Sequence, residues 1–271
     1  MTSSTDIPAR HNPRTEFEIA PRVTFGRNVV FGDNCKRVRI GFGAFLGDDL
    51  YLDLPELAIG DYVKFHRGGL LHGYEPCHIG HNCWIGQNTI IDSIGGATIG
   101  NNVGIGASSQ LWSHIKFGDT LAGCRWNSHG PLIVEDDVWF VGHCIVSPIH
   151  AQRQSMALVG SVVTKDMAEN HVYAGVPARD VTDKVGPQFT PVPYEQKLAR
   201  FSQLHQEFLR TSRLKEADFR ATVVDNLTGR ESTEHETFFN LGDRTYHPSR
   251  SEHEYRFFQF ILYDRAKFVP A

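Results

Sequence analysis

Apolar residues recur at every sixth position through the middle of the chain, and neither common secondary structure has this period. A helix places apolar residues about every 3.6 positions, and a half-buried strand places them at every second position. Ile79, Ile85 and Ile91 follow the six-residue period, and apolar residues repeat the same spacing 20 residues earlier and 20 residues later. Three hexads and two further residues therefore form one repeating unit. Such a repeat predicts a solenoid rather than a compact mixed domain.

The position four residues after each of these apolar residues is the second part of the pattern. It is always small, and its occupants are Val63, Gly69, Cys83, Thr89, Val103, Ser109, Val138 and Cys144. We interpret each hexad as one short flat strand that points its first side chain inward, where a narrow interior leaves room only for small neighbours. Three such strands make a triangular coil, and stacked coils pair in parallel at about 4.8 Å. Cys83 and Cys144 are accordingly expected to be interior residues rather than nucleophiles or metal ligands.

Composition and charge restrict the classes of function. The chain has 271 residues, 41% of them hydrophobic, and a formal net charge of −4, which provides no basic footprint for nucleic acid or for an anionic membrane surface. No stretch approaches about 18 unbroken apolar residues, so no integral membrane segment is predicted, and the first residues lack a signal-peptide core. Five cysteines without a CxxC pair are typical of a reducing compartment, and we expect a cytoplasmic protein.

The hexads resemble those of the hexapeptide-repeat acyltransferases. This resemblance implies an all-β solenoid, a left-handed parallel β-helix, over residues 23–185. The hexads leave an N-terminal segment at 1–22 and a C-terminal α/β appendage at 186–271 outside the solenoid. The left hand is implied by the resemblance alone, because ordinary crossover connections favour the opposite hand. The fold alone does not determine function, since unrelated activities share it.

The six-residue period stops after Leu111 for about twenty residues and resumes in VEDDVWFVGHCIV. This order is similar to that of the sugar acetyltransferase branch, in which a Ser/Thr-x-His segment precedes a loop and a Val-Trp unit follows. The resemblance implies that His114 is the general base, a role that imidazole fills near neutral pH. His129 and His150, near the same break, remain alternatives. The resemblance also implies a homotrimer, in which the loop from Lys116 to Pro131 forms a wall of the neighbouring subunit's site.

A second signature, SVVTKDMAENHVYAGVPARDV at residues 161–181, closely matches the terminal segment of that family and implies acetyl-CoA as cosubstrate. Carried over by position, the expected acetyl-CoA-binding residues are Trp139, Gly142, Val159, Thr164, Lys165 and Arg179. Asn88 matches an active-site asparagine, and Asp92 lies close to an acidic position that binds the acceptor. Three departures stand out. VWFVGH replaces the usual VWIGAN, and Thr182 replaces a second basic residue. The segment IVSPIHAQRQSMALVGSVV is one residue shorter than the family's two hexads, so a bulge is expected between Ser147 and Ala157.

Beyond residue 186 the hexads end and the pattern changes. The segment PVPYEQKLARFSQLHQEFLRTSRLKEADF predicts a helix with one apolar face, and FRATVVDNLTG and ETFFNLGDRTYHP predict strands. The tail HEYRFFQFILYDRAKF suits a buried helix or a buried strand equally. We interpret its aromatic residues as core packing, with an acceptor-binding module as the functional alternative.

Taken together, these patterns predict an enzyme that moves an acetyl group from acetyl-CoA to a hydroxyl or an amine of a sugar or nucleotide sugar, without a metal. Two alternatives remain. One is a non-catalytic scaffold or binding protein on the same solenoid. The other is a metalloenzyme similar to the γ-class carbonic anhydrases, which bind zinc through three histidines, two of them five positions apart. No two histidines between residues 66 and 150 have that separation.

Overall fold

The computed structural model describes residues 10–271 and divides the chain into two compact units, Met1–Phe189 and Thr190–Ala271. This division falls four residues after the expected boundary at 185. Residues 1–9 of the expected N-terminal segment lie outside the described residues. Strand β1 (Glu16–Ile19) already pairs with β4 (Arg37–Ile40), so the coils begin before residue 23.

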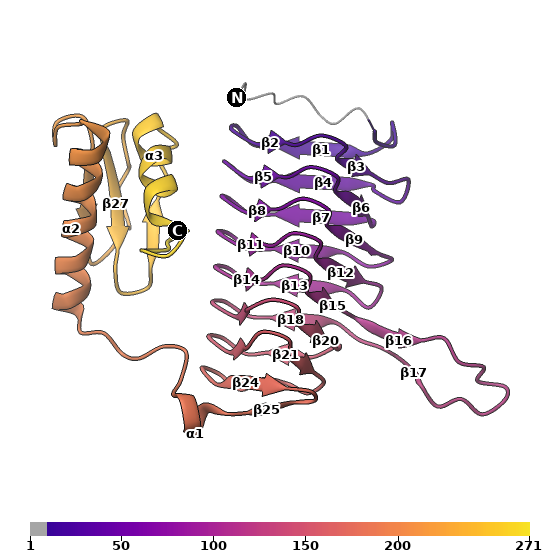
Figure 1. The fold of residues 1–271 in the computed structure, drawn as a ribbon. Helices are drawn as coiled ribbons and strands as arrows, with labels where there is room; N and C mark the ends of the chain where they lie inside the picture. The colour runs from indigo at the N-terminus through magenta and orange to yellow at the C-terminus, as the bar shows by residue number, and fades with distance from the viewer. Residues whose placement is uncertain (1–9) are drawn as a thin grey trace. The chain divides into compact units, whose positions relative to one another are not determined.

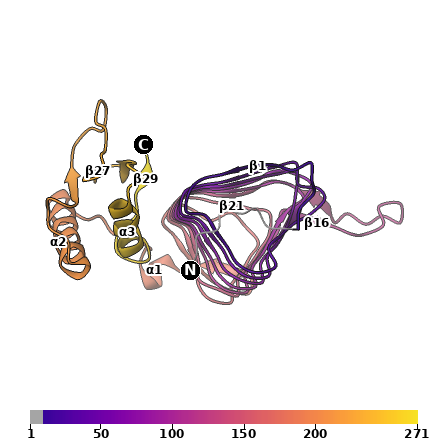
Figure 2. The ribbon, with the colours of Figure 1, turned by 90° about the horizontal axis from the view of Figure 1, so that it is seen from above.

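The first unit is a parallel β-helix whose triangular coils are seen end-on in Figure 2. Each coil gives one strand to each of three sheets, and only the last pair, β24 with β25, is antiparallel. The first sheet contains β1, β4, β7 (Glu56–Ile59), β10 (Cys77–Ile79), β13 (Ala97–Ile99), β18 (Leu132–Val134) and β21 (His150–Ala151). The second contains β2 (Thr24–Phe25), β5 (Phe45–Leu46), β8 (Lys64–Phe65), β11 (Trp84–Ile85), β14 (Gly104–Ile105), β19 (Trp139–Phe140), β22 (Met156–Ala157), β24 (Val172–Gly175) and β25 (Ala178–Asp180). The third contains β3 (Val30–Phe31), β6 (Tyr51–Asp53), β9 (Leu70–Gly73), β12 (Ile90–Ser93), β15 (Gln110–Leu111), β20 (Ile145–Val146) and β23 (Val162–Val163).

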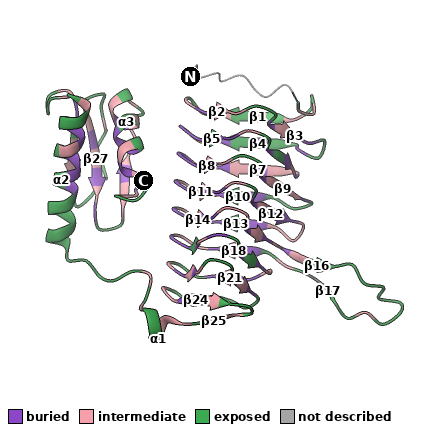
Figure 3. Ribbon diagram, viewed as in Figure 1, coloured by how far each residue is buried: buried purple, intermediate pink, exposed green. Residues whose placement is uncertain are grey.

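The interior of the coils confirms the hexad interpretation. Ile79, Ile85 and Ile91 are at most 3% exposed and belong to one continuous apolar core. Buried segments, drawn in purple, recur from coil to coil in Figure 3. Every small residue at the fourth-on position is buried, including Cys83 and Cys144. Burying an isoleucine side chain contributes about 1.5–3 kcal/mol, so the stacked hexads provide the main stabilising term of this unit.

The later coils are shorter than the earlier ones. Phe140 pairs with Ala157 and Val146 pairs with Val163, which are steps of 17 residues instead of 20. Pairing continues without interruption between these coils, so the predicted bulge between Ser147 and Ala157 was wrong. The coil is shorter by these residues, and its strands still pair in regular register.

The break in the repeat forms a hairpin that projects from the coils (Figure 1). Strand β16 (His114–Lys116) pairs antiparallel with β17 (Asn127–His129). The connecting loop exposes three large apolar side chains: Phe117 at 102%, Leu121 at 97% and Trp126 at 74%. The hairpin therefore gains little from packing within its own unit.

The second unit is an α/β domain. A short helix, α1 (Thr182–Val185), closes the first unit, and the second consists of α2 (Tyr194–Ser212), β26 (Arg220–Val223), β27 (Glu236–Asn240), β28 (Thr245–His247), α3 (Glu252–Ile261) and β29 (Val269–Pro270). The four strands form one sheet in the order β26-β27-β28-β29. The tail that suited either structure is a helix, capped where the Ser251 side chain accepts from the Glu254 N–H. Phe208, Phe239 and Phe257 are buried together, so these aromatic residues form the core of the unit.

Candidate active site

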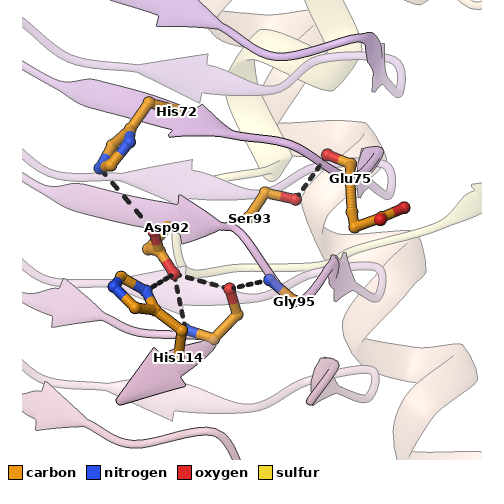
Figure 4. A network of polar contacts seen from close by, with 7 residues as sticks. His72, Glu75, Asp92, Ser93, Gly95 and His114 are labelled. Carbon is orange, nitrogen blue, oxygen red and sulfur yellow. Dashed lines mark hydrogen bonds and ion pairs between the residues drawn. The ribbon is translucent and has the colours of Figure 1, made fainter. Parts of the chain in front are cut away.

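Three residues meet at the point where the chain leaves the regular coil (Figure 4). Oδ1 of Asp92, on β12, accepts hydrogen bonds from Ser113 N at 3.0 Å and from Ser113 Oγ at 2.6 Å. The same oxygen lies 2.8 Å from Nδ1 of His114, the first residue of β16. Asp92 and Ser113 are 0% exposed, and the His114 side chain is 20% exposed. The structure thus brings together His114 and Asp92, two of the residues singled out in the sequence.

The turn out of the coil supplies the donors that hold the buried carboxylate. Ser113 Oγ donates to Asp92 and accepts from the Gly95 N–H at 2.8 Å, which fixes its hydroxyl proton on the carboxylate side. A Cβ on Gly95 would lie 2.5 Å from the Ser113 carbonyl oxygen, so this close approach requires glycine. Burying an ionised carboxylate is costly unless donors surround it, and this turn brings three to one oxygen.

This arrangement determines the tautomer of His114. Because Asp92 Oδ1 accepts both bonds from Ser113, the contact with His114 is donated by the Nδ1–H group. The second ring nitrogen, Nε2, is then unprotonated in the neutral ring and can accept a proton. A carboxylate that orients an imidazole in this way is the arrangement that general-base histidines need.

A second histidine approaches the other oxygen of the same carboxylate. His72, on β9, stands directly beside Asp92 in the parallel register of β9 and β12. Its Nε2 lies 3.8 Å from Asp92 Oδ2, an oxygen that is buried and has no hydrogen-bond partner among the described residues. The His72 side chain is 33% exposed, so it borders both the network and solvent.

The two alternative histidines occupy different surroundings. His129 is exposed and lies opposite His114 in the hairpin register. His150 Nε2 is 2.6 Å from Glu135 Oε1, with both side chains about 40% exposed. The Arg153 backbone N–H and then the His150 ring hold the pKa of Glu135 below its usual range. Neither alternative has a buried carboxylate partner, so His114 has the stronger geometry for a base.

Comparison with known proteins finds similarity to acetyltransferases. The bifunctional protein GlmU of Burkholderia multivorans is 29% identical over 157 residues, covering 54% of this chain and 33% of the relative. The galactoside O-acetyltransferase of Escherichia coli is 33% identical over 110 residues, covering 39% of this chain and 53% of the relative. A crystallographic structure of the polysialic acid O-acetyltransferase OatWY aligns with a TM-score of 0.52 at 19% identity, covering 68% of this chain and 91% of that chain. No family model matches the chain.

The chain has the repeats and the fold of the hexapeptide-repeat acetyltransferases. The predicted resemblance and the predicted left-handed parallel β-helix are thereby confirmed. The chain spans between a third and about half of the length of the curated relatives it matches. The likeness therefore concerns the repeats and the fold, and not the whole length of these relatives.

The structure separates the expected active-site asparagine, Asn88, from His114. Asn88 is exposed at the corner before β12 with a φ of 55°. It precedes Asp92 by four residues, about 13 Å of extended chain, and no hydrogen bond links it to His114 among the described residues. Within one chain Asn88 serves as a corner residue, because asparagine tolerates the left-handed conformation. Asp92 is likewise buried against His114 instead of lying open to an acceptor.

Two of the expected acetyl-CoA-binding positions, Gly142 and Val159, follow β19 and β22 where the chain turns toward the third sheet, and a third, Trp139, is the first residue of β19. Gly142 is buried, and its carbonyl oxygen accepts from the Gly160 N–H at 2.9 Å, which stacks the two turns. Val159 in the second turn is 67% exposed, and Trp139 on β19 is 46% exposed. A Cβ on Gly104 would lie 2.9 Å from the Trp139 ring, so the indole packs closely against this glycine.

The remaining expected positions are at other places on the last coils. Thr164 and Lys165 follow β23, and Arg179 lies on β25, all exposed to solvent. Neither cation forms an ion pair within residues 10–271, so both are available to a phosphate. In that same part of the chain, no group of three or more His, Cys, Asp or Glu side chains is placed to hold a metal ion. No helix there is both long and apolar enough to cross a membrane.

The sequence interpretation missed three contributors to the network: His72, Ser113 and Gly95. His72 could have been found, because it precedes Asp92 by 20 residues, the length of one coil. Ser113 and Gly95 meet across the break, where the repeat no longer specifies which residues are neighbours. Only the three-dimensional arrangement reveals their roles.

Proposed function

We propose that the chain transfers an acetyl group from acetyl-CoA to a hydroxyl, or an amine, of a sugar or nucleotide-sugar acceptor, with His114 as the general base. The observation that carries the proposal is the contact between His114 Nδ1 and Asp92 Oδ1, which leaves Nε2 free to take a proton. The hexapeptide repeats shared with a galactoside O-acetyltransferase support the sugar acceptor. All five cysteines are free, which suits the reducing cytoplasm that we propose as its location.

The chemistry needs only groups that the network provides. Nε2 of His114 takes the proton of the acceptor hydroxyl as the hydroxyl oxygen attacks the thioester carbonyl. The new C–O bond forms, the C–S bond breaks, and the proton held on Nε2 passes to the departing thiolate. Asp92 stabilises the imidazolium that exists between these steps, because its Oδ1 accepts from Nδ1–H throughout. No side-chain nucleophile is required.

The proposed roles of the acetyl-CoA-binding residues follow from their surroundings. Gly142 has no side chain, so an extended chain could approach the backbone of this turn closely. Lys165 and Arg179 form no ion pair within the described part of the chain. One is a flexible point charge and the other a planar fork, and both suit phosphate. These exposed groups fit the polar end of acetyl-CoA, while Trp139 offers an aromatic face nearer the middle coils.

We propose a homotrimer because the outer face of the third sheet exposes apolar residues that other copies of the chain could bury. The outward residues of neighbouring strands form one mainly apolar column: Tyr51, Leu70, Ile90, Gln110, Ile145 and Val162. Tyr51 and Ile145 are 44% and 43% exposed, and this sheet leads directly to His114. A second copy would bury this column, and the exposed hairpin would reach toward the copy's site. Light scattering should give the mass of three 30.5 kDa chains, whereas a monomer mass would contradict the trimer.

The proposed function is tested by comparing the wild type with His114→Ala. Calorimetric titration of acetyl-CoA should give the same affinity in both proteins, because His114 does not hold the cosubstrate. Thiol release over a panel of sugars and nucleotide sugars should occur in the wild type and fall at least about a hundredfold in the variant, the usual size of general-base catalysis. Absence of acetyl-CoA binding in both would favour a non-catalytic scaffold. Equal thiol release would exclude His114 as the base.

A further inference from the structure

The two carboxylate oxygens of Asp92 differ in their hydrogen-bond partners. Oδ1 accepts three hydrogen bonds, from Ser113 N, Ser113 Oγ and His114 Nδ1, whereas the buried Oδ2 accepts none from residues 10–271. An unsatisfied buried acceptor usually costs about 1–3 kcal/mol, and more when it is charged. The role proposed for His114 needs this carboxylate ionised, so a missing partner at Oδ2 is significant.

His72 is placed to be that partner. It lies opposite Asp92 in the strand register, and its Nε2 stops 3.8 Å from Oδ2, about 0.8 Å beyond hydrogen-bond length (Figure 4). Because the side chain is one-third exposed, its ring can turn without disturbing the core. His72 is on the same sheet as Asp92 but one coil earlier, so the backbone hydrogen bonds between β9 and β12 fix the distance between their Cα atoms.

We propose that His72 is a positioning residue for the base: its Nε2–H donates to Asp92 Oδ2 in the working enzyme, and this bond keeps Oδ1 directed at His114. The inference rests on the proposed function, in which His114 takes the acceptor proton. One carboxylate then joins two imidazoles from adjacent coils. The His72 bond satisfies the second oxygen, stabilises the charged carboxylate, and prevents rotation about a side-chain torsion that is intrinsically soft.

Two variants separate the hydrogen bond from the bulk of the ring. His72→Phe keeps a planar ring but has no donor, and we expect kcat to fall about tenfold with KM for the acceptor unchanged. His72→Gln retains an N–H donor and should recover most of the lost kcat. His78→Phe is the matched control, because His78 is an exposed histidine on the neighbouring β10, and its kcat should match the wild type.

A spectroscopic measurement tests the same idea without acetyl transfer. Nitrogen NMR of His114 should show the Nδ1–H tautomer in the wild type and in His72→Gln, and a mixture of tautomers in His72→Phe. A protein that transfers no acetyl group but shows this pattern would refute the proposed function and keep the role of His72. If His72→Phe does not fold, His72→Leu takes its place in both measurements.

Two results would overturn the inference. A raised KM for the acceptor with unchanged kcat in His72→Phe would make His72 an acceptor-binding residue instead. An unchanged His114 tautomer together with unchanged kcat would show that Asp92 needs no partner at Oδ2.

Discussion

Replacing Asp92 by asparagine removes the charge of the central carboxylate and keeps its shape. The position of the amide oxygen can be inferred from the network. Ser113 N is a backbone donor fixed by the turn, and it lies 3.0 Å from Oδ1. The asparagine oxygen should therefore occupy the Oδ1 position, and the amide NH2 should occupy the Oδ2 position, where it faces His72 Nε2 and is accommodated by the His72 tautomer that carries its proton on Nδ1. His114 then still finds an acceptor at Nδ1 and keeps the tautomer that leaves Nε2 free.

The expected magnitude follows from that geometry. A hydrogen bond to a charged group contributes about 1.5–3 kcal/mol, and one between neutral groups about 0.5–1.5 kcal/mol. The loss at His114 is then about 1–1.5 kcal/mol, which corresponds to a fall in kcat of about tenfold. Folding stability should change by less than about 1 kcal/mol, because the variant buries a neutral amide in place of a charge with an unsatisfied oxygen.

Asp92→Ala provides the contrast, since it leaves buried donors of Ser113 without an acceptor. We expect it to lower the free energy of unfolding by about 3 kcal/mol or more and to remove most of the activity. The assays are urea unfolding and initial rates of thiol release, each with wild type, Asp92→Asn and Asp92→Ala. A loss of a thousandfold or more in Asp92→Asn, with intact folding, would show that the amide turns its NH2 group toward His114. Such a result would refute the argument that Ser113 sets the orientation.

Three further predictions test the core, the coil packing and the cosubstrate positions. Burial raises the pKa of the Cys77 thiol from 9.0 to about 12. The unfolded chain therefore releases this proton first, and the free energy of unfolding falls as the pH rises above 9. In urea unfolding, the decrease in this free energy between pH 9 and 10.5 should be about 2 kcal/mol smaller in Cys77→Val than in the wild type. In Gly106→Ala the new Cβ would lie 1.9 Å from a backbone oxygen of the next coil, and the free energy of unfolding should fall by at least about 2 kcal/mol. In the control Gly130→Ala the new Cβ meets nothing within 4 Å, and the free energy of unfolding should stay within about 0.5 kcal/mol of the wild type. Equal stabilities of the two variants would contradict the close stacking of the coils. Lys165→Ala and Arg179→Ala should each raise KM for acetyl-CoA about tenfold at unchanged kcat, and an unchanged KM in both would remove these residues from the cosubstrate site.

The coils could be predicted from the sequence because the hexad is a local rule with a physical cause. An inward apolar residue and a small residue four positions later are both required by a narrow triangular interior, and Ile85 with Thr89 satisfies both. The later coils were harder to predict, because the step of 17 residues between Phe140 and Ala157 removes residues at a corner, where no packing rule applies. The pattern could locate these strands but could not show how the shortened coil closes.

The appended unit shows a different limit. Its helix α2 was predictable from apolar spacing, but the tail that forms α3 contains aromatic residues that suit strands and helices equally. Phe257 and Phe258 are both buried against β27 and β28, and this packing against residues distant in sequence selects the helix. Tertiary contacts decided what local propensity left open.

The location of the candidate site follows from the constraint that makes the repeat regular. Inside a coil each strand is bonded to the strands before and after it, so its backbone donors are occupied, and its interior positions hold apolar or small residues. A buried carboxylate such as Asp92 needs free donors, and for Asp92 they are supplied where the chain leaves the coil: the Ser113 N–H and hydroxyl donate to it, and the Gly95 N–H fixes the hydroxyl. The same departure starts the hairpin with His114, which places the imidazole beside the carboxylate that this turn stabilises. The break in the hexads and the proposed base are therefore one structural feature, and this explains why the sequence could identify His114 at the break but could not identify the donors that hold its partner.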